Sequence, residues 1–299
     1  MKKYIYFKEQ IIMVKRGKNI NLYLIDGDVN GRIKCTLANW TGVIFKIPQT
    51  KVERISNREE LKQSGIYFLF GSRDDNEKDS VYIGQASIRS NGEGLLYRIN
   101  EHKNDTTKDY WTEAVAVTTS NNSFGPTEIS YLEHRMVNIA KESNRYEVKN
   151  GNIPNIGNVT EEKQSELEDF LDNAKIVMGA LGYKVFEKIM NDEERDVLEP
   201  GFVYEVKGVR AMGRRTSEGF VLLKGSQLSP SISEVGGDKV RIQREKYADD
   251  IDMNNYVIND ILFKSPSGAA KFVSGNSVNG NVSWKTIDGR TLGEVLKLI

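Results

Sequence analysis

Five side chains between residues 67 and 133 have the types that cleavage of a phosphodiester requires: Tyr67, Tyr82, Arg98, His102 and Glu133. This reaction needs an activated water, a cation for the charge on the non-bridging oxygens, and a group that stabilises the leaving oxygen. Glu133 offers the single carboxylate that a mostly water-coordinated Mg²⁺ ion can use. Arg98 is a permanent, planar cation suited to bidentate phosphate contact. The residue types therefore favour metal-dependent phosphodiester chemistry.

The two tyrosines depend on their surroundings for any role as a base. The ordinary pKa of tyrosine is about 10, so a tyrosine base near neutral pH requires cations that favour the phenolate. Arg98 and a metal ion could supply that charge. His102 follows Arg98 by one helical turn, which places both side chains on one helix face and lets the imidazole take or relay a proton. Either tyrosine can be the one that activates water.

The residue patterns around these side chains predict a small α/β unit of about 90 residues. A polar loop over 71–80 separates two β-like apolar runs, which predicts a hairpin with one tyrosine on each strand. Glu133 lies at the edge of an apolar stripe with helical spacing. The expected elements are strands over 66–70, 81–84 and 114–119 and helices over 95–102 and 128–141. The tyrosine hydroxyls can then converge on one face of the hairpin.

The tripeptides Gly65-Ile66-Tyr67 and Tyr82-Ile83-Gly84, followed by Arg98, His102 and Glu133, resemble the GIY-YIG nuclease family, a metal-dependent phosphodiesterase module. The resemblance implies that these residues form the active site, that Glu133 holds Mg²⁺ or Mn²⁺, and that one tyrosine activates water. It also implies a core of three antiparallel strands flanked by helices. Family members usually carry an asparagine beyond the glutamate helix. We choose Asn150 for this position, with Asn152 and Asn144 as alternatives.

Two features depart from the family pattern. The stretch from Gly84 to Arg98 is longer than in the shortest members, with Asn91-Gly92-Glu93-Gly94 inserted, and is similar to the restriction-enzyme branch. Gln85 stands where some members have lysine. The missing lysine removes one charge that would lower the pKa of a tyrosine.

The whole chain is expected to be an α+β protein of several units. We expect an N-terminal β-rich section over 1–62, a nuclease domain over 63–155, a helical connector over 156–200 and a C-terminal α+β, DNA-binding domain over 201–299. The run 263–284 resembles a small C-terminal domain of obscure role, which is often attached to GIY-YIG proteins and to modification or restriction enzymes.

Charge is segregated along the chain, although 42 basic and 42 acidic residues balance overall. Residues 1–62 hold 13 Lys or Arg against 6 Asp or Glu, whereas 161–199 hold 5 against 12. Basic side chains in two regions are candidates for contact with DNA phosphates. They are Lys46, Lys51 and Arg54 before the hairpin, and Arg210, Arg214 and Arg215 in an expected loop around Met212-Gly213.

Several other classes of protein and site are disfavoured. A single cysteine, Cys35, excludes an internal disulfide, and one cysteine with two histidines cannot supply a structural zinc site. No apolar run approaches the roughly 20 residues needed to cross a bilayer, so we expect a cytoplasmic protein without a membrane partner. Asp196 with Glu205 and Lys207 fits the loose Asp, Glu-x-Lys pattern of another metal-dependent nuclease class. That pattern often arises by chance.

Together these features predict a Mg²⁺-dependent DNA endonuclease, which family analogy places in restriction or another defence against foreign DNA. One alternative is a repair or mobile-element nuclease that nicks a particular structure. Another is a catalytically inactive DNA-binding protein. One active site cuts one strand, so double-strand cleavage would require a homodimer, two successive visits or a partner subunit.

Overall fold

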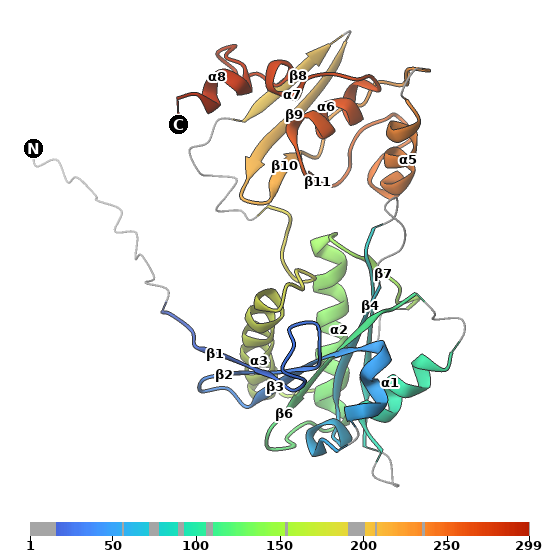
Figure 1. Ribbon diagram of the computed structural model, residues 1–299, viewed down its shortest axis with the longest axis vertical. Coiled ribbons are helices and arrows are strands. Elements are labelled where there is room, and N and C mark those ends of the chain that lie inside the picture. Colours follow the sequence, from blue (N-terminus) through green and yellow to red (C-terminus); the bar gives the residue numbers. More distant parts are fainter. Residues whose placement is uncertain are drawn as a thin grey trace, which may run out of the picture.

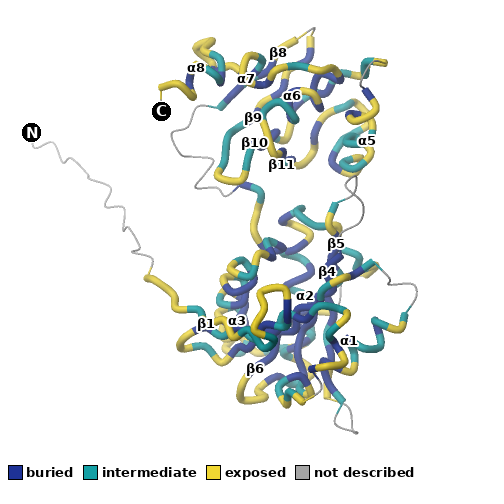
Figure 2. Tube along the Cα trace, in the orientation of Figure 1, coloured by how far each residue is buried: buried dark blue, intermediate teal, exposed yellow. Residues whose placement is uncertain are grey.

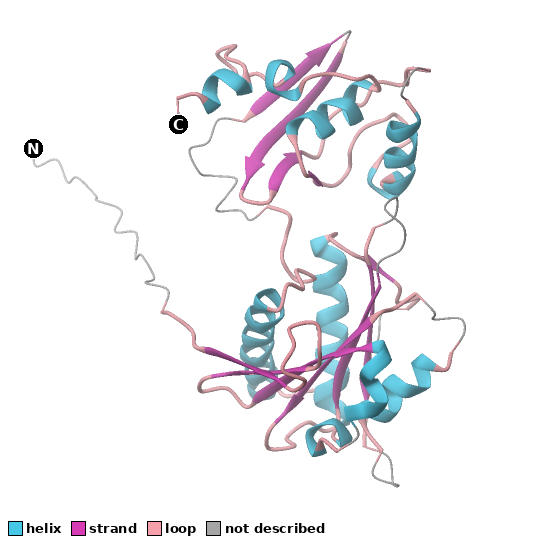
Figure 3. Ribbon diagram, viewed as in Figure 1, coloured by secondary structure: helices cyan, strands magenta, loops and turns pink. Residues whose placement is uncertain are grey.

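The computed structural model describes residues 16–55, 57–71, 78–88, 93–105, 110–152, 155–190, 201–206, 208–234 and 237–298. These residues form two units, each with its own sheet and its own apolar core (Figure 1). Both units contain helices as well as strands (Figure 3), and the expected α+β class is confirmed. Within the described ranges, no helix has the length and apolar character that crossing a bilayer requires.

The sheet of the first unit contains the strands β1 (Ile20–Leu24), β2 (Ile33–Leu37), β3 (Gly42–Pro48), β4 (Gly65–Gly71), β5 (Ser80–Ala86), β6 (Glu113–Thr119) and β7 (Glu147–Val148). Their order across the sheet is β1-β2-β3-β6-β4-β5-β7. Neighbours are antiparallel except β5 and β7, which are parallel. The three strands expected around the tyrosines are therefore adjacent, as β6, β4 and β5.

The sheet has seven strands rather than the three expected, because the N-terminal strands continue it. β3 pairs with β6 along its whole length, from Gly42 opposite Thr119 to Pro48 opposite Glu113. Without β3, the backbone groups along one side of β6 would form an open edge. The described part of the section 1–62 thus belongs to the same sheet as the hairpin and is not a separate β section.

The helices of this unit are η1 (Gln49–Ile55) and η2 (Glu59–Lys62), which are 3₁₀ helices, and α1 (Leu95–Lys103), α2 (Pro126–Ser143) and α3 (Glu161–Ala180). α2 and α3 cover the face of the sheet that carries Ile66 and Phe68. α1 and the 3₁₀ helices cover the face that carries Tyr67 and Leu69. β4 is consequently buried along its whole length (Figure 2), which explains its continuous apolar run.

α3 is part of this core and is not the connector expected over 156–200. Its residues Leu171, Ala174 and Val177 are fully buried and belong to the same cluster as Ile44 of β3. The apolar stripe of a helix needs a surface to pack against, and the added strands β2 and β3 provide it. Residues 191–200 lie outside the described residues.

The second unit contains the strands β8 (Phe202–Val206), β9 (Val209–Thr216), β10 (Gly219–Leu222) and β11 (Ile261–Phe263), and the helices α5 (Asp238–Lys246), η4 (Ala248–Asp250), α6 (Pro266–Ser274), α7 (Gly280–Ser283) and α8 (Leu292–Leu296). The strands form an antiparallel sheet in the order β11-β10-β9-β8. α6 begins at Ser265, whose hydroxyl accepts from the Gly268 N–H, and ends at Gly275 with φ 71°.

The expected basic loop around Met212-Gly213 is instead part of β9. Alternate residues of β9 are buried, and Gly213 leaves room for Phe220, whose Cζ would lie 2.6 Å from a Cβ at this position. Pairing with both β8 and β10 keeps the segment extended. Because faces alternate along a strand, Arg215 lies on the opposite face from Arg210 and Arg214.

A buried carboxylate joins the two units. Asp250 is 2% exposed and accepts hydrogen bonds from Lys78 Nζ at 2.6 Å and from Asn144 Nδ2 at 2.7 Å in the first unit. Within the second unit, Asn259 Nδ2 donates to the same carboxylate at 3.0 Å. Asn144 ends α2, and Lys78 lies two residues before β5. The second unit is therefore attached at the ends of α2 and β5.

We expect Asp250→Ala to loosen this attachment. The change leaves the mostly buried Lys78 ammonium without its carboxylate, which costs about 3–5 kcal/mol for a buried pair. The radius of gyration from X-ray scattering should increase and the midpoint of urea unfolding should fall. Asp249→Ala is the matched control, since Asp249 is exposed. Equal scattering curves for both variants would show that Asp250 does not hold the units together.

Candidate active site

Tyr67 and Tyr82 lie on the same face of the β4–β5 hairpin. In the antiparallel register, Tyr67 is opposite Gly84 and Leu69 is opposite Tyr82. Opposed residues share a face, as do residues two apart on one strand. The centroids of the two tyrosine rings are 6.2 Å apart. The rings are thus neighbours, as the hairpin pattern predicts.

The glycines of the two tripeptides make this packing possible. A Cβ on Gly84 would lie 2.5 Å from Cζ of Tyr67, so the tyrosine side chain crosses the strand where Gly84 has none. A Cβ on Gly65 would lie 2.6 Å from Cδ1 of Leu95, at the start of α1. Gly84 therefore admits the Tyr67 ring, and Gly65 admits α1.

The Tyr67 hydroxyl is the centre of a buried network. It lies 2.7 Å from Nε2 of His102 on α1. The Arg98 guanidinium and the Tyr82 side chain lie close enough to influence the pKa of Tyr67, which Arg98 lowers and Tyr82 raises. Tyr67 is 1% exposed and His102 is 4% exposed, whereas Tyr82 is half-buried. Four of the expected site residues thus come together, and Tyr82 is the tyrosine nearer to solvent.

Burial raises the pKa of Tyr67 above its ordinary value, and the nearby Tyr82 raises it further. The Arg98 cation acts in the opposite direction but does not overcome burial. Burial therefore favours the neutral hydroxyl of Tyr67 over the phenolate. The Tyr67 hydroxyl has one proton, so it can donate a hydrogen bond either to His102 Nε2 or to the Tyr82 oxygen, but not to both at once.

Arg98 extends from this network toward solvent. Its side chain is 41% exposed and forms an ion pair with Oε2 of Glu101 at 2.6 Å. An exposed pair of this kind contributes little stability, so a phosphate can take the place of Glu101. Glu101 was not among the expected site residues, although its position three residues after Arg98 on a helix is a recognisable signal.

Asn150 and Glu133 contact the outer edge of β5. Asn150 Oδ1 accepts from the Ile83 N–H at 3.1 Å, and Asn150 Nδ2 donates to the Ile83 carbonyl at 2.7 Å. Glu133, on α2, lies close enough to the backbone N–H of Gln85 for that group to lower its pKa. β7 pairs only with Ser80 and Val81 of β5. The two side chains therefore occupy the edge beyond β7, where a longer strand would lie.

Of the three asparagines considered for the family position, Asn150 is the one that bonds to strand β5, whereas Asn144 accepts from Lys78 just before that strand. Asn144 lies at the seam and donates to Asp250, while Asn152 is exposed. The oxygen and the nitrogen of the Asn150 amide both form hydrogen bonds with the backbone of Ile83, which lies between Tyr82 and Gly84. Asn150 is thus a positioning residue for this strand.

Glu133 has the properties of a metal ligand. It is 8% exposed, and burial raises its pKa to about 7, against a smaller opposing effect of the Gln85 N–H. No three His, Cys, Asp or Glu side chains of the described residues group together to hold a metal by themselves. A single buried carboxylate still fits Mg²⁺, which keeps most of its waters and takes one or two protein carboxylates. α2 covers the face of the sheet opposite the tyrosines, so Glu133 lies on the other side of the sheet from the Tyr67 network.

The candidate DNA contacts fall in two places, and several are already paired. Lys46 pairs with Glu113 at 3.0 Å, Lys51 pairs with Asp26 at 3.2 Å, and Arg54 is exposed on η1. The arginines lie on β9 of the second unit, where Arg210 pairs with Glu205 at 3.3 Å. Ion pairing reduces the positive charge that these residues offer to phosphates.

The competing Asp, Glu-x-Lys site gains no support. Asp196 and Lys207 lie outside the described residues. Glu205 is opposite Arg210 across the β8–β9 pair, and both side chains are well exposed. Such a pair is ordinary for the solvent face of a sheet.

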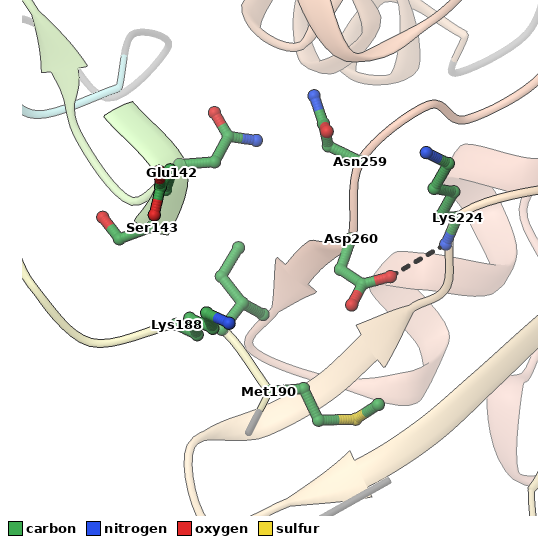
Figure 4. Close-up of a pocket in the computed structure, with 9 residues that line it drawn as sticks. Glu142, Ser143, Lys188, Met190, Lys224, Asn259 and Asp260 are labelled. Carbon is green, nitrogen blue, oxygen red and sulfur yellow. Dashed lines mark hydrogen bonds between the residues drawn. The ribbon is translucent and has the colours of Figure 1, made fainter. Parts of the chain in front are cut away.

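A small cavity of about 160 Å³ lies at the seam between the units (Figure 4). Glu142 and Ser143, at the end of α2, line it from the first unit, and Asn259 and Asp260 line it from the second. Asp260 accepts from the backbone N–H of Lys224 at 2.9 Å. None of the candidate catalytic side chains lines this cavity.

Comparison with known proteins finds a similarity over part of the chain. Residues 202–296, which make up most of the second unit, match a family described as a domain of unknown function, DUF4357. No curated protein and no solved structure matches the chain. The family description names no activity, and the matched residues do not include the first unit.

We expect Gly84→Ala to displace Tyr67. The added methyl would overlap the Tyr67 ring, and forced overpacking typically costs about 1–3 kcal/mol. Urea unfolding should report this loss. Gly201→Ala is the control, because no atom lies within 4 Å of a Cβ at that position. Equal unfolding midpoints for the two variants would contradict the close crossing.

The raised pKa of Glu133 predicts a pH-dependent effect of Glu133→Gln on stability. Between the ordinary pKa of 4.5 and the folded value of about 7, the unfolded chain loses this proton first, so wild-type stability falls as pH rises. The amide variant avoids that loss and should be more stable at pH 8, by as much as about 3 kcal/mol, with no advantage at pH 4. Thermal unfolding in EDTA measures the difference. A variant less stable than wild type at pH 8 would argue against a buried, uncompensated carboxylate.

Proposed function

We propose that this protein is a Mg²⁺-dependent DNA endonuclease with an active site of the GIY-YIG type in its first unit. One observation carries the proposal. The Tyr67 hydroxyl lies 2.7 Å from His102 Nε2 and also contacts Tyr82 and Arg98, across a glycine that a larger residue could not replace. Ordinary core packing does not require these polar groups to meet, whereas phosphodiester cleavage uses each of them.

The half-buried Tyr82 is the group that receives the proton of the attacking water. Its ring is a neighbour of the Tyr67 ring, with centroids 6.2 Å apart, and the Tyr67 hydroxyl in turn lies 2.7 Å from His102 Nε2. When Tyr82 accepts a proton, a proton can pass from Tyr82 to Tyr67. At the same time the proton of Tyr67 passes to His102. Tyr67 therefore stays neutral before and after the step, as its raised pKa requires. The sequence leaves open which tyrosine activates water, and our proposal assigns this role to Tyr82.

Arg98 and Glu133 act on the phosphate. Arg98 is exposed enough to exchange Glu101 for the non-bridging oxygens of the substrate. Glu133 is the residue that would hold the metal ion, and Mn²⁺ can replace Mg²⁺ at such an oxygen ligand. When bound, the ion would supply charge neutralisation at the non-bridging oxygens. By family analogy, we also propose a role in restriction or another defence. The same analogy suggests a homodimer for double-strand cleavage.

We expect the purified protein to nick supercoiled plasmid in Mg²⁺ and to stop in EDTA. Tyr67→Phe, Tyr82→Phe, Arg98→Ala and Glu133→Gln should each slow nicking by roughly 10²- to 10⁴-fold, the range for loss of a positioned proton-transfer or charge-stabilising group. Gel analysis of nicked plasmid over time gives the rates.

Tyr131→Phe is the matched control for the tyrosines. Tyr131 is also 1% exposed, and its hydroxyl donates to Glu168 away from the hairpin, so the variant should nick like wild type. Nicking by Glu133→Gln at the wild-type rate would refute the proposed site. Loss of nicking in Glu205→Gln alone would favour the competing site.

A further inference from the structure

A groove lined by lysines runs across the second unit. It encloses about 650 Å³ between α5 and the segment from β11 into α6. Lys239 and Lys246 line it from α5, Lys264 follows β11, and Lys271 lies on α6. No Asp or Glu side chain is among the described residues that line it.

The charge of this groove is uncompensated. None of its four lysines forms an ion pair with another described residue. Lys239, Lys264 and Lys271 are exposed, and Lys246 is half-buried. The DNA contacts expected from sequence differ in this respect, since Lys46, Lys51 and Arg210 have carboxylate partners. The groove thus gathers four ammonium groups that have no ion-pair partner in the part of the chain that the structure describes, and such a cluster attracts anions.

The groove adjoins the seam between the two units. Lys246 also lines a cavity of about 410 Å³ at the seam, together with Glu147 and Val148 of β7. Figure 1 likewise shows α5 on the side of the second unit that faces β7. Asn150, two residues after β7, holds the edge of β5 to which Glu133 is attached. The seam cavity carries the carboxylates of Glu147, Glu245 and Asp249, so the net positive charge is concentrated in the groove itself.

We propose that the sugar-phosphate backbone of duplex DNA binds in this groove, beside the site of cleavage. This inference rests on the proposed nuclease function and adds the surface that holds the substrate. Duplex DNA carries one charge per about 1.7 Å of its axis, which suits a row of flexible point charges. Apolar side chains in the same groove, such as Leu262 and Phe263, can pack against the sugars. The contact is independent of base sequence, because it involves only the backbone.

The test measures DNA binding without cleavage. The full chain with Glu133→Gln is titrated against a labelled duplex in Mg²⁺ over a series of salt concentrations, with fluorescence anisotropy as the readout. Adding Lys264→Gln and Lys271→Gln should weaken binding roughly 10- to 100-fold at 0.1 M salt and reduce the slope of log K against log salt by about 2, close to one unit for each lost phosphate contact. Both lysines are exposed, so the fold should be unaffected, which circular dichroism checks.

Lys285→Gln with Lys297→Gln is the matched control. These two lysines are exposed, belong to the same unit and change the net charge equally, but they do not line the groove. Affinity and salt slope should stay at the parent values. Equal effects of the two pairs, or no effect of the groove pair, would overturn the groove as the binding surface.

The binding test and the nicking test can fail independently of each other. If wild type nicks plasmid while the groove pair binds normally, the groove inference alone is wrong. If wild type fails to nick and the groove pair still loses affinity and salt slope, the catalytic proposal alone is wrong.

Discussion

The register of the β4–β5 hairpin is the constraint on which the candidate site depends. It sets Tyr67 opposite Gly84, so that the tyrosine crosses the partner strand and its hydroxyl reaches His102 at 2.7 Å. A slip of one residue would send Tyr82 to the face covered by α2, because successive side chains point to opposite faces. Asn150 holds the same register from outside, since its amide pairs with both backbone groups of Ile83. The polar network follows from this geometry.

Burial on both faces of the sheet explains why distant segments belong to one unit. The β4 residues Ile66 and Phe68 need α2 and α3 on one side, while Tyr67 and Leu69 need α1 and η1 on the other. β3 closes the side of β6 that β4 does not use. The same burial raises the pKa of both Tyr67 and Glu133. The packing that stabilises the sheet therefore also determines which of these groups can carry charge.

The seam between the units links substrate binding to chemistry in the proposed enzyme. Asp250 connects the second unit to Asn144, at the end of the helix that carries Glu133, and to Lys78, just before the strand that carries Tyr82. Arg145 adds a second link through two hydrogen bonds to Glu218, at 2.7 and 2.9 Å. A DNA backbone held by the second unit would consequently lie at a fixed distance from both groups. That arrangement assigns positioning to one unit and cleavage to the other.

The sequence by itself determined the local elements and the residue types of the site. Two apolar runs separated by a polar loop identified the hairpin, and helical spacing placed Arg98 and His102 on one helix face. These features depend on neighbours a few residues apart, for which the pattern of residue types is sufficient.

Only the tertiary structure decided which of these elements meet. Long-range contacts decide the addition of β1–β3 to the sheet, the packing of α3 and the extended conformation around Gly213. They also decide the protonated state of Tyr67 and the place of Asn150 at the β5 edge. Burial and pairing with distant strands override local preference, and no short stretch of sequence contains them.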